Sequence, residues 1–170
     1  MPKLPHIDPN GARLRRRFLV PLFDTSAGLW YLTTLAPKID ATVTTRTKGW
    51  LSSVPGGSLL LMTHTGAKSG LPRTTPLLYF SRGDDVVVMA SNYGRASHPA
   101  WLANVRANPG VTLTFRGRTG HYRARVAQGA ERAQLWATAK AYVRNYASYE
   151  EATPNREIQI VVCEYSGDTE

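Results

Sequence analysis

The sequence predicts one α+β domain, built mainly from antiparallel strands that close into a small barrel with helices outside. Short β-prone runs follow one another through the middle of the chain, turns rich in glycine separate them, and few helical segments lie between them. Strands in such succession favour antiparallel pairing over a doubly wound parallel sheet. A chain of 170 residues is long enough for one such domain with a substantial core.

The first 35 residues are expected to form an N-terminal arm, and residues 36–170 the folded domain. Residues 1–17 carry prolines, a glycine and arginines without periodicity, which predicts a mobile arm. The basic residues of 13–17 precede the apolar run Phe18–Phe23, a pattern typical of contact with an anionic membrane surface, of an export signal or of an arm packed on the domain. Pro21 interrupts the run, so a spanning helix is not expected.

Two short helices are expected within residues 27–50, divided near Pro37, and the break at Pro55-Gly56-Gly57 ends them. The apolar run Leu59–Thr65 predicts the first strand. Thr74–Ser81 is its expected partner, because the two runs face each other across a short glycine-containing turn.

The β-branched run within Asp85–Ser91 predicts the third strand. A helix is expected over His98–Asn108, because Pro99 stands near its start, where proline is tolerated. Val111–Phe115 and His121–Val126 are expected to form a hairpin around the glycines between them.

A long helix is expected over Gly129–Tyr149, because apolar residues recur there at intervals of three or four. The final strand is expected over Glu157–Glu164. It contains Cys163, the only cysteine of the chain, so no intrachain disulfide can form. The four histidines are scattered and no ligand spacing suggests a metal site.

The charge balance restricts the classes of partner. Lysine and arginine number 21 against 12 aspartates and glutamates, a net charge of +9 that attracts nucleic acid, anionic lipid or an anionic small molecule. The cations are dispersed and no nucleic-acid-binding motif is present, so nucleic acid is not expected as a partner.

The segment Thr63–Pro76 is the best candidate for an anion site. It places two glycines, two cations and five hydroxyl side chains in one turn between apolar runs. Glycines let backbone N–H groups approach a ligand closely, and Lys68 and Arg73 suit an anionic group. A hairpin turn with solvated charges is the alternative interpretation.

Several segments stand in an order and at a spacing that one known family shares. They are Thr-Gly-Ala-Lys-Ser-Gly-Leu-Pro-Arg-Thr-Thr-Pro at 65–76, Ala-Ser-Asn-Tyr-Gly-Arg at 90–95, His-Pro-Ala-Trp-Leu-Ala-Asn-Val-Arg-Ala-Asn-Pro at 98–109, Tyr-Ala-Ser-Tyr at 146–149 and Arg-Glu-Ile-Gln-Ile-Val-Val at 156–162. Residues 40–165 thereby resemble the deazaflavin-dependent nitroreductase family of actinobacteria, in its branch of F420H2-dependent quinone and enone reductases. The resemblance implies a split β-barrel, the FMN-binding split barrel-like fold.

The resemblance also implies roles for individual residues. Those matching the family's cofactor site are Lys68, Ser69, Gly70, Arg73, Thr75, Pro76, Ser91 and Asn92. Those matching the substrate pocket are Trp101, Tyr146 and Tyr149. Ser91, Tyr146 and Tyr149 are the candidate catalytic residues, because a hydroxyl can stabilise or protonate an oxygen that gains negative charge. Val143 stands where nitroreducing members carry a further tyrosine.

The implied activity is hydride transfer from reduced coenzyme F420, an 8-hydroxy-5-deazaflavin with an acidic arm, to a quinone-like, enone or nitroaromatic acceptor. A non-catalytic F420 carrier and an FMN-dependent split-barrel oxidoreductase are the alternatives. The expected location is cytoplasmic, or peripheral on the inner face of the cell membrane if the N-terminal arm binds anionic lipid.

Overall fold

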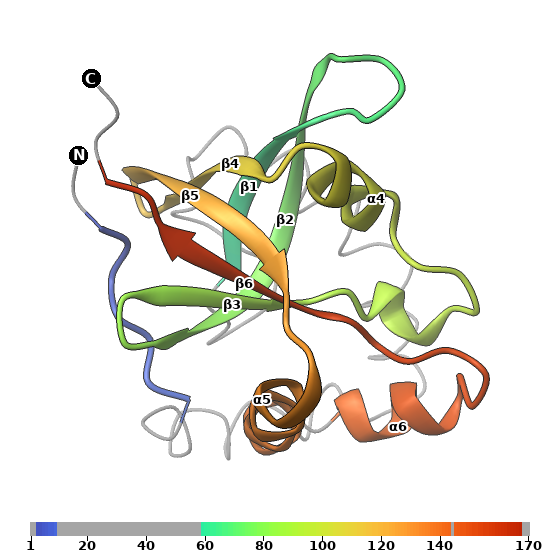
Figure 1. Ribbon diagram of the computed structural model, residues 1–170. Coiled ribbons are helices and arrows are strands. Elements are labelled where there is room, and N and C mark those ends of the chain that lie inside the picture. The colour runs from blue at the N-terminus through green and yellow to red at the C-terminus, as the bar shows by residue number, and fades with distance from the viewer. Residues whose placement is uncertain (1–2, 10–58, 144, 168–170) are drawn as a thin grey trace.

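The architecture is a closed antiparallel barrel of six strands (Figure 1), seen in a computed structural model that describes residues 3–9, 59–143 and 145–167. The strands follow the order β1-β2-β3-β6-β5-β4 around the barrel. Their bounds are β1 Leu59–Thr65, β2 Pro72–Arg82, β3 Asp85–Met89, β4 Gly110–Phe115, β5 Arg118–Val126 and β6 Ile160–Tyr165. The predicted barrel is confirmed, while the helices expected in 27–50 and the boundary after residue 35 lie outside the described residues.

Helices lie outside the barrel, as predicted. They are the short 3-10 helix η3 Asn92–Gly94, α4 Ala100–Ala107, α5 Gly129–Tyr142 and α6 Asn145–Glu151. The single helix expected over 129–149 is wrong: Val143, at φ −131° and ψ 107°, is extended and ends α5. β-Branched valine is a weak helix former, and the apolar spacing continues across the break, which hides it from the sequence.

Alternation along the strands divides the core in two. One face of each strand fills the barrel, where Leu60, Met62 and Tyr79 are almost fully buried. The next residue along β2, Phe80, points to the other side and packs edge-on against Tyr142 of α5, with ring centres 5.8 Å apart. One strand thus contributes to both the interior and the layer beneath α5.

Residues 3–9 pack against the barrel, which corrects the mobile arm expected over residues 1–17. The Leu4 N–H donates to the Tyr122 hydroxyl at 3.1 Å. Ile7 and Ser81 exchange two hydrogen bonds, of 3.0 Å to the serine Oγ and 2.9 Å to the isoleucine carbonyl. The proposed membrane contact falls on residues that the structure does not describe, so it stays a prediction.

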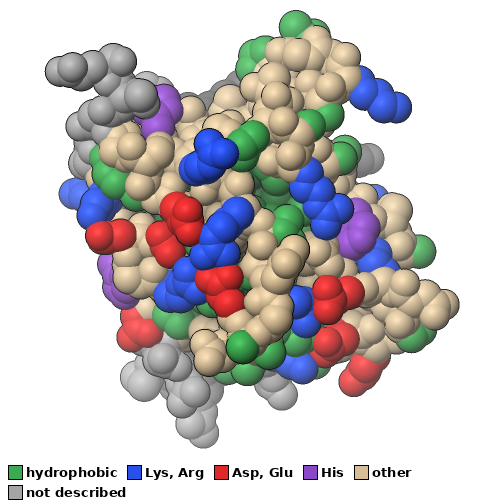
Figure 2. Space-filling model, viewed as in Figure 1, with side chains coloured by type: hydrophobic (Ala, Val, Ile, Leu, Met, Phe, Trp, Pro, Cys, Tyr) green, Lys and Arg blue, Asp and Glu red, His purple; other side chains and the backbone are tan. Residues whose placement is uncertain are grey.

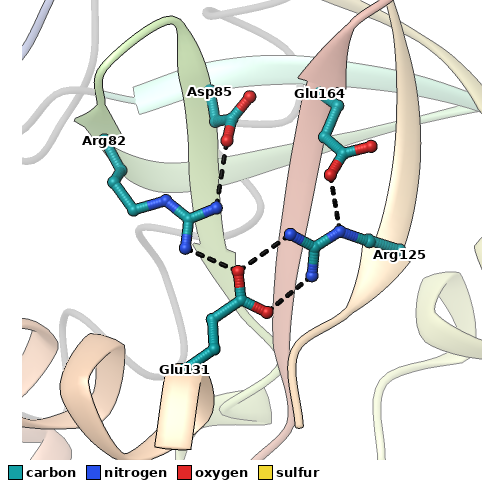
Figure 3. A network of polar contacts seen from close by, with 5 residues as sticks. All are labelled: Arg82, Asp85, Arg125, Glu131 and Glu164. Carbon is teal, nitrogen blue, oxygen red and sulfur yellow. Dashed lines mark hydrogen bonds and ion pairs between the residues drawn. The ribbon is translucent and has the colours of Figure 1, made fainter.

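A cluster of ion pairs fastens α5 to the barrel (Figure 3). Glu131, in the first turn of α5, accepts from Arg125 of β5 at 2.6 and 2.8 Å and from Arg82 of β2 at 2.6 Å. Asp85 and Glu164 complete the cluster on β3 and β6. Figure 2 shows basic and acidic side chains gathered on one face of the molecule. Because Glu131 pairs with both Arg82 and Arg125, one carboxylate of α5 is bound to two strands of the barrel.

Among the described residues, no helix has the length and apolarity needed to cross a membrane. Over the same part of the chain, no group of three histidine, cysteine or acidic side chains is placed to hold a metal ion. Cys163 is buried inside the barrel, and burial raises the pKa of its thiol to about 12.

Candidate functional site

The turn between β1 and β2 presents the two candidate cations to solvent. It projects from the barrel in Figure 1, and Lys68 and Arg73 are both exposed. None of the carboxylates in the described segments lies within ion-pair distance of either cation. The cations are therefore available to an external anion.

Backbone hydrogen bonds close this turn on itself. The Gly66 N–H donates to the Leu71 carbonyl at 2.9 Å, and the Gly70 N–H to the Gly66 carbonyl at 2.8 Å. Gly70 adopts φ +66°, a conformation that glycine takes without strain. A Cβ on Gly66 would lie 2.6 Å from Ser69 Oγ and 3.2 Å from Arg73 Nε, so glycine is needed for these side chains to close over the backbone.

A chain of polar contacts holds the turn to the barrel. The Ala67 N–H donates to Asn104 Oδ1 of α4 at 2.9 Å, which fixes the orientation of that amide. Asn104 Nδ2 then donates to His64 Nδ1 at 3.3 Å, so the ring proton is on Nε2, which donates to Thr75 Oγ1 at 3.1 Å. The candidate turn and the candidate Thr75 are thus linked through two residues that sequence reasoning missed.

His64 is the buried residue in the middle of this series of hydrogen bonds. Only 4% of its surface is exposed. Burial, followed by the charge of Arg73, lowers the pKa of His64. The neutral imidazole can therefore accept from Asn104 while it donates to Thr75. His64 stands inside the Gly-rich motif, but nothing in that motif distinguishes a buried histidine from a solvated one.

A split in the barrel wall lies beside this turn. β2 pairs with β1 over Pro72–Leu78 and with β3 only over Tyr79–Arg82. Beyond Val88, β3 leaves β2 and stays with β6, where the Ala90 N–H donates to the Gln159 carbonyl at 2.9 Å. Among the described strands, the first half of β2 therefore has no partner on that side.

The candidate ring-binding residues lie on the two sides of this split. Continued past Val88, the β2–β3 register would set Ser91 opposite Pro76 and Asn92 opposite Thr75. Pro76 has no N–H to donate to a ladder, and the chain at Ser91 turns away into η3. The two pairs of candidates therefore lie where β2 and β3 stop pairing, and their contact with a planar ring stays a prediction.

Tyr149 packs on the turn that begins at Ser91. A Cβ on Gly94, where φ is +71°, would lie 2.9 Å from Tyr149 Cδ1. Burial raises the pKa of Tyr149, with a smaller opposing effect of the hydrogen bond to Asn145. The phenol therefore keeps its proton at neutral pH and is available as a hydrogen-bond donor.

The other two candidate pocket residues are more deeply buried. Trp101 is 5% exposed and belongs to the cluster inside the barrel. Tyr146 is 4% exposed and stacks with Trp136 at 5.8 Å between ring centres, in the cluster beneath the barrel. Tyr146 neighbours Tyr149, with ring centres 6.2 Å apart, whereas Trp101 lies in a different cluster. Contact of either buried residue with an acceptor stays a prediction.

The contact between Gly94 and Tyr149 gives a first testable prediction. Gly94→Ala adds a Cβ both at a left-handed backbone position and against a ring, whereas Gly83→Ala meets only the backbone effect, since φ is +59° and nothing lies within 4 Å. We expect Gly83→Ala to lower the free energy of unfolding by about 1 kcal/mol and Gly94→Ala by about 1–3 kcal/mol more. Urea denaturation of both variants measures the difference, and equal losses would contradict the contact.

A separate hollow of about 360 Å³ lies along β1, β4 and β5. Its lining includes Thr63, His64, Thr65 and Pro72 of the candidate anion segment, with His121 of β5, but none of the residues matched to the family's cofactor site or substrate pocket. The hollow therefore adjoins the base of the candidate turn, and the matched residues lie outside it.

Comparison with known proteins identifies a family and several relatives. Residues 38–165 match the family model described as F420H(2)-dependent quinone reductase. The putative F420H(2)-dependent quinone reductase Rv3178 of Mycobacterium tuberculosis is 39% identical over 77 residues, which are 45% of this chain and 65% of that protein. The chain thus spans just under two thirds of that relative. The F420H(2)-dependent quinone reductase Rv1261c of the same species is 34% identical over 113 residues, 64% of this chain and 75% of that one.

Solved structures agree with this comparison. A structure described as an F420-H2 dependent reductase (FDR-A) is 34% identical, with a TM-score of 0.58, and the match covers 63% of this chain and 94% of that one. HutZ, a heme storage protein from Vibrio cholerae, is 10% identical with a TM-score of 0.51, over 65% of this chain and 83% of that one. The second likeness shows the fold alone, and the predicted split β-barrel is confirmed.

Proposed function

The chain belongs to the F420H(2)-dependent quinone reductase family, and we propose that it transfers a hydride from reduced coenzyme F420 to quinone-like, enone or nitroaromatic acceptors. The observation that supports this assignment most directly is a cationic turn, free of carboxylate partners among the described residues, next to a split in the barrel wall. The cationic turn suits an acidic arm, and the split suits a planar ring.

The turn is the proposed site for the acidic arm. Lys68 and Arg73 supply charge, and Ser69 and Gly70 supply a hydroxyl and a closely approachable backbone. Asn104 holds this turn from behind through the Ala67 N–H. A turn that is ordered before binding loses less conformational entropy when the ligand arrives, which favours affinity.

The split is the proposed site for the deazaflavin ring. In this proposal Thr75 and Pro76 of β2 contact one side of the ring, and Ser91 and Asn92, which follow β3, contact the other. A bound reduced deazaflavin supplies the hydride, and the chain contributes position and electrostatics. Holding the donor and acceptor in contact can account for about 7–11 kcal/mol of barrier reduction, so positioning is the main contribution of these residues.

Hydroxyl groups are the proposed donors to the acceptor. Hydride addition to a quinone or an enone leaves negative charge on oxygen, and a donor aimed at that oxygen contributes about 2–4 kcal/mol. Tyr149, which keeps its proton, and Ser91, at the start of η3, are the donors that we propose for this role. Tyr146 and Trp101 complete the proposed acceptor pocket, provided that binding opens the clusters in which they lie.

Turnover with a chosen acceptor tests the function. We expect the purified chain to oxidise reduced F420 in the presence of menadione, followed by the absorbance of the deazaflavin. Tyr149→Phe should slow turnover by about 10- to 100-fold without abolishing it, because one donor is lost and positioning remains. Tight binding of F420 without turnover would instead identify a carrier, and a chain purified with bound FMN would identify a flavin enzyme.

A further inference from the structure

Three consecutive residues at the split adopt a left-handed backbone. Asn92, Tyr93 and Gly94 have φ values of 49°, 55° and 71°. Glycine takes this conformation freely and asparagine tolerates it, but a tyrosine rarely does. Such backbones persist where the surrounding structure holds them in place, and they gather at functional sites. Something must therefore fix the segment that carries Ser91 and Asn92.

Arg156 contacts both ends of this segment. Its Nη2 donates to the Ser91 carbonyl at 2.8 Å, and its Nη1 to the Ala90 carbonyl at 3.2 Å and toward His98 Nδ1 at 3.4 Å. Burial, followed by the charges of Arg156 and Arg106, lowers the pKa of His98, so its neutral ring can accept. One guanidinium therefore joins the start of the turn at Ala90 to its end at His98.

The surroundings of Arg156 differ from those of a structural ion pair. Over the described residues, no carboxylate forms a salt bridge with it, and its buried Nε has no hydrogen-bond partner. Burial lowers the pKa of its guanidinium. An unpaired, partly desolvated cation is unfavourable for stability. The buried Nε of Arg132 likewise makes no hydrogen bond, but the charge of Arg132 is compensated: it pairs with Glu157 at 3.1 Å, and its Nη2 donates to the Ile158 carbonyl.

We propose that Arg156 is a positioning residue that holds the segment Ala90–His98, with its left-handed turn at residues 92–94, and so sets Ser91 and Asn92 at the split. This inference rests on the proposed function, because only a ligand in the split makes the placement of these two side chains matter. Lysine cannot replace arginine here, because a single ammonium lacks the planar fork that reaches both carbonyls and the histidine ring.

Hydrogen exchange on the ligand-free protein tests whether Arg156 holds the turn. In Arg156→Lys and Arg156→Gln we expect the amides of Gly94 and Arg95, which donate to the Ser91 and Asn92 carbonyls, to exchange about 10-fold faster or more, since each tenfold corresponds to about 1.4 kcal/mol of lost protection. Amides of β1 and β4 should not change. Arg132→Lys is the matched control, and it should leave the amides of Gly94 and Arg95 unchanged. Equal exchange of these two amides in the Arg156 and Arg132 variants would overturn the proposal.

Kinetics and F420 binding test whether this positioning by Arg156 matters for catalysis. Because the turn at 66–73 is the proposed site of the acidic arm, the Kd of oxidised F420 should change by no more than about 3-fold in Arg156→Lys, while kcat with menadione falls about 10- to 100-fold from misplacement of Ser91 and Asn92. Faster exchange with an unchanged kcat would overturn the positioning role in catalysis. If the wild-type chain shows no turnover, the proposed function fails, and the exchange result still decides whether Arg156 holds the turn.

Discussion

Replacing Lys68 and Arg73 together by alanine is expected to weaken the binding of oxidised coenzyme F420 by about 100-fold or more. Each charge-assisted hydrogen bond to an anionic arm contributes about 1.5–3 kcal/mol, and two of them exceed the 2.8 kcal/mol, roughly, that a hundredfold represents. Both side chains are exposed and neither pairs with a carboxylate of the described chain, so their removal should leave the fold intact. Fluorescence titration of the deazaflavin measures the change.

The effect of net charge on the Kd must be distinguished from the effect of the two cations at the turn. Arg116→Ala with Arg118→Ala removes the same two charges from another exposed turn, between β4 and β5. This control lowers the general attraction of the molecule for anions but leaves the turn at 66–73 intact. We expect its Kd to stay within about 3-fold of wild type, because exposed charges at a distance are screened by salt. Equal weakening in both double variants would contradict the assignment of the arm to Lys68 and Arg73.

The same turn shows what the sequence can reveal about the site. Its glycines and cations stand within one short segment, so their chemistry could be inferred without the fold. The contacts that order it could not, because Asn104 lies 37 residues from Ala67 and 40 from His64. Arg156 lies 65 residues from Ser91. Long-range contacts leave no local pattern, so positioning residues emerge only from the structure.

For the fold, too, some features could be predicted from the sequence and others could not. Leu59–Thr65 has the predicted bounds, because Gly66 follows the run and its first residues are apolar. The place of β6 between β3 and β5 was not predictable, since pairing with distant strands depends on the closed barrel as a whole. The break after Tyr142 was missed because Tyr146, beyond it, continues the apolar spacing and is buried in the same cluster as Ala139.

Glu131→Gln is expected to lower the free energy of unfolding at pH 7 by about 1–3 kcal/mol, between the effect of an exposed ion pair and that of a buried one. The Glu131 side chain is 29% exposed, and those of its partners Arg82 and Arg125 are 38% and 39% exposed. The variant leaves both guanidinium groups without their shared carboxylate. It also removes the negative charge from the first turn of α5, where the helix dipole favours it.

The loss in free energy of unfolding caused by Glu131→Gln should become smaller as the pH falls. Hydrogen bonds from Arg125 and then Arg82 lower the pKa of Glu131 to about 2, from an ordinary value of 4.5. A carboxyl group whose folded-state pKa is depressed stabilises the fold above its unfolded-state pKa, and this contribution disappears as the pH falls from about 4.5 toward 2. The difference between wild type and Glu131→Gln should therefore be full at pH 7 and shrink steadily below pH 4.5.

Urea denaturation at several pH values measures this difference. Asp84→Asn is the matched control, because Asp84 pairs only with Lys3 in the described chain and both side chains are well exposed, at 70% and 48%. Its effect should stay below about 0.5 kcal/mol. Among the described residues, only Glu131 connects Arg82 on β2 with Arg125 on β5. A loss in Glu131→Gln no greater than in Asp84→Asn would therefore mean that these ion pairs do not help to hold α5 to the barrel.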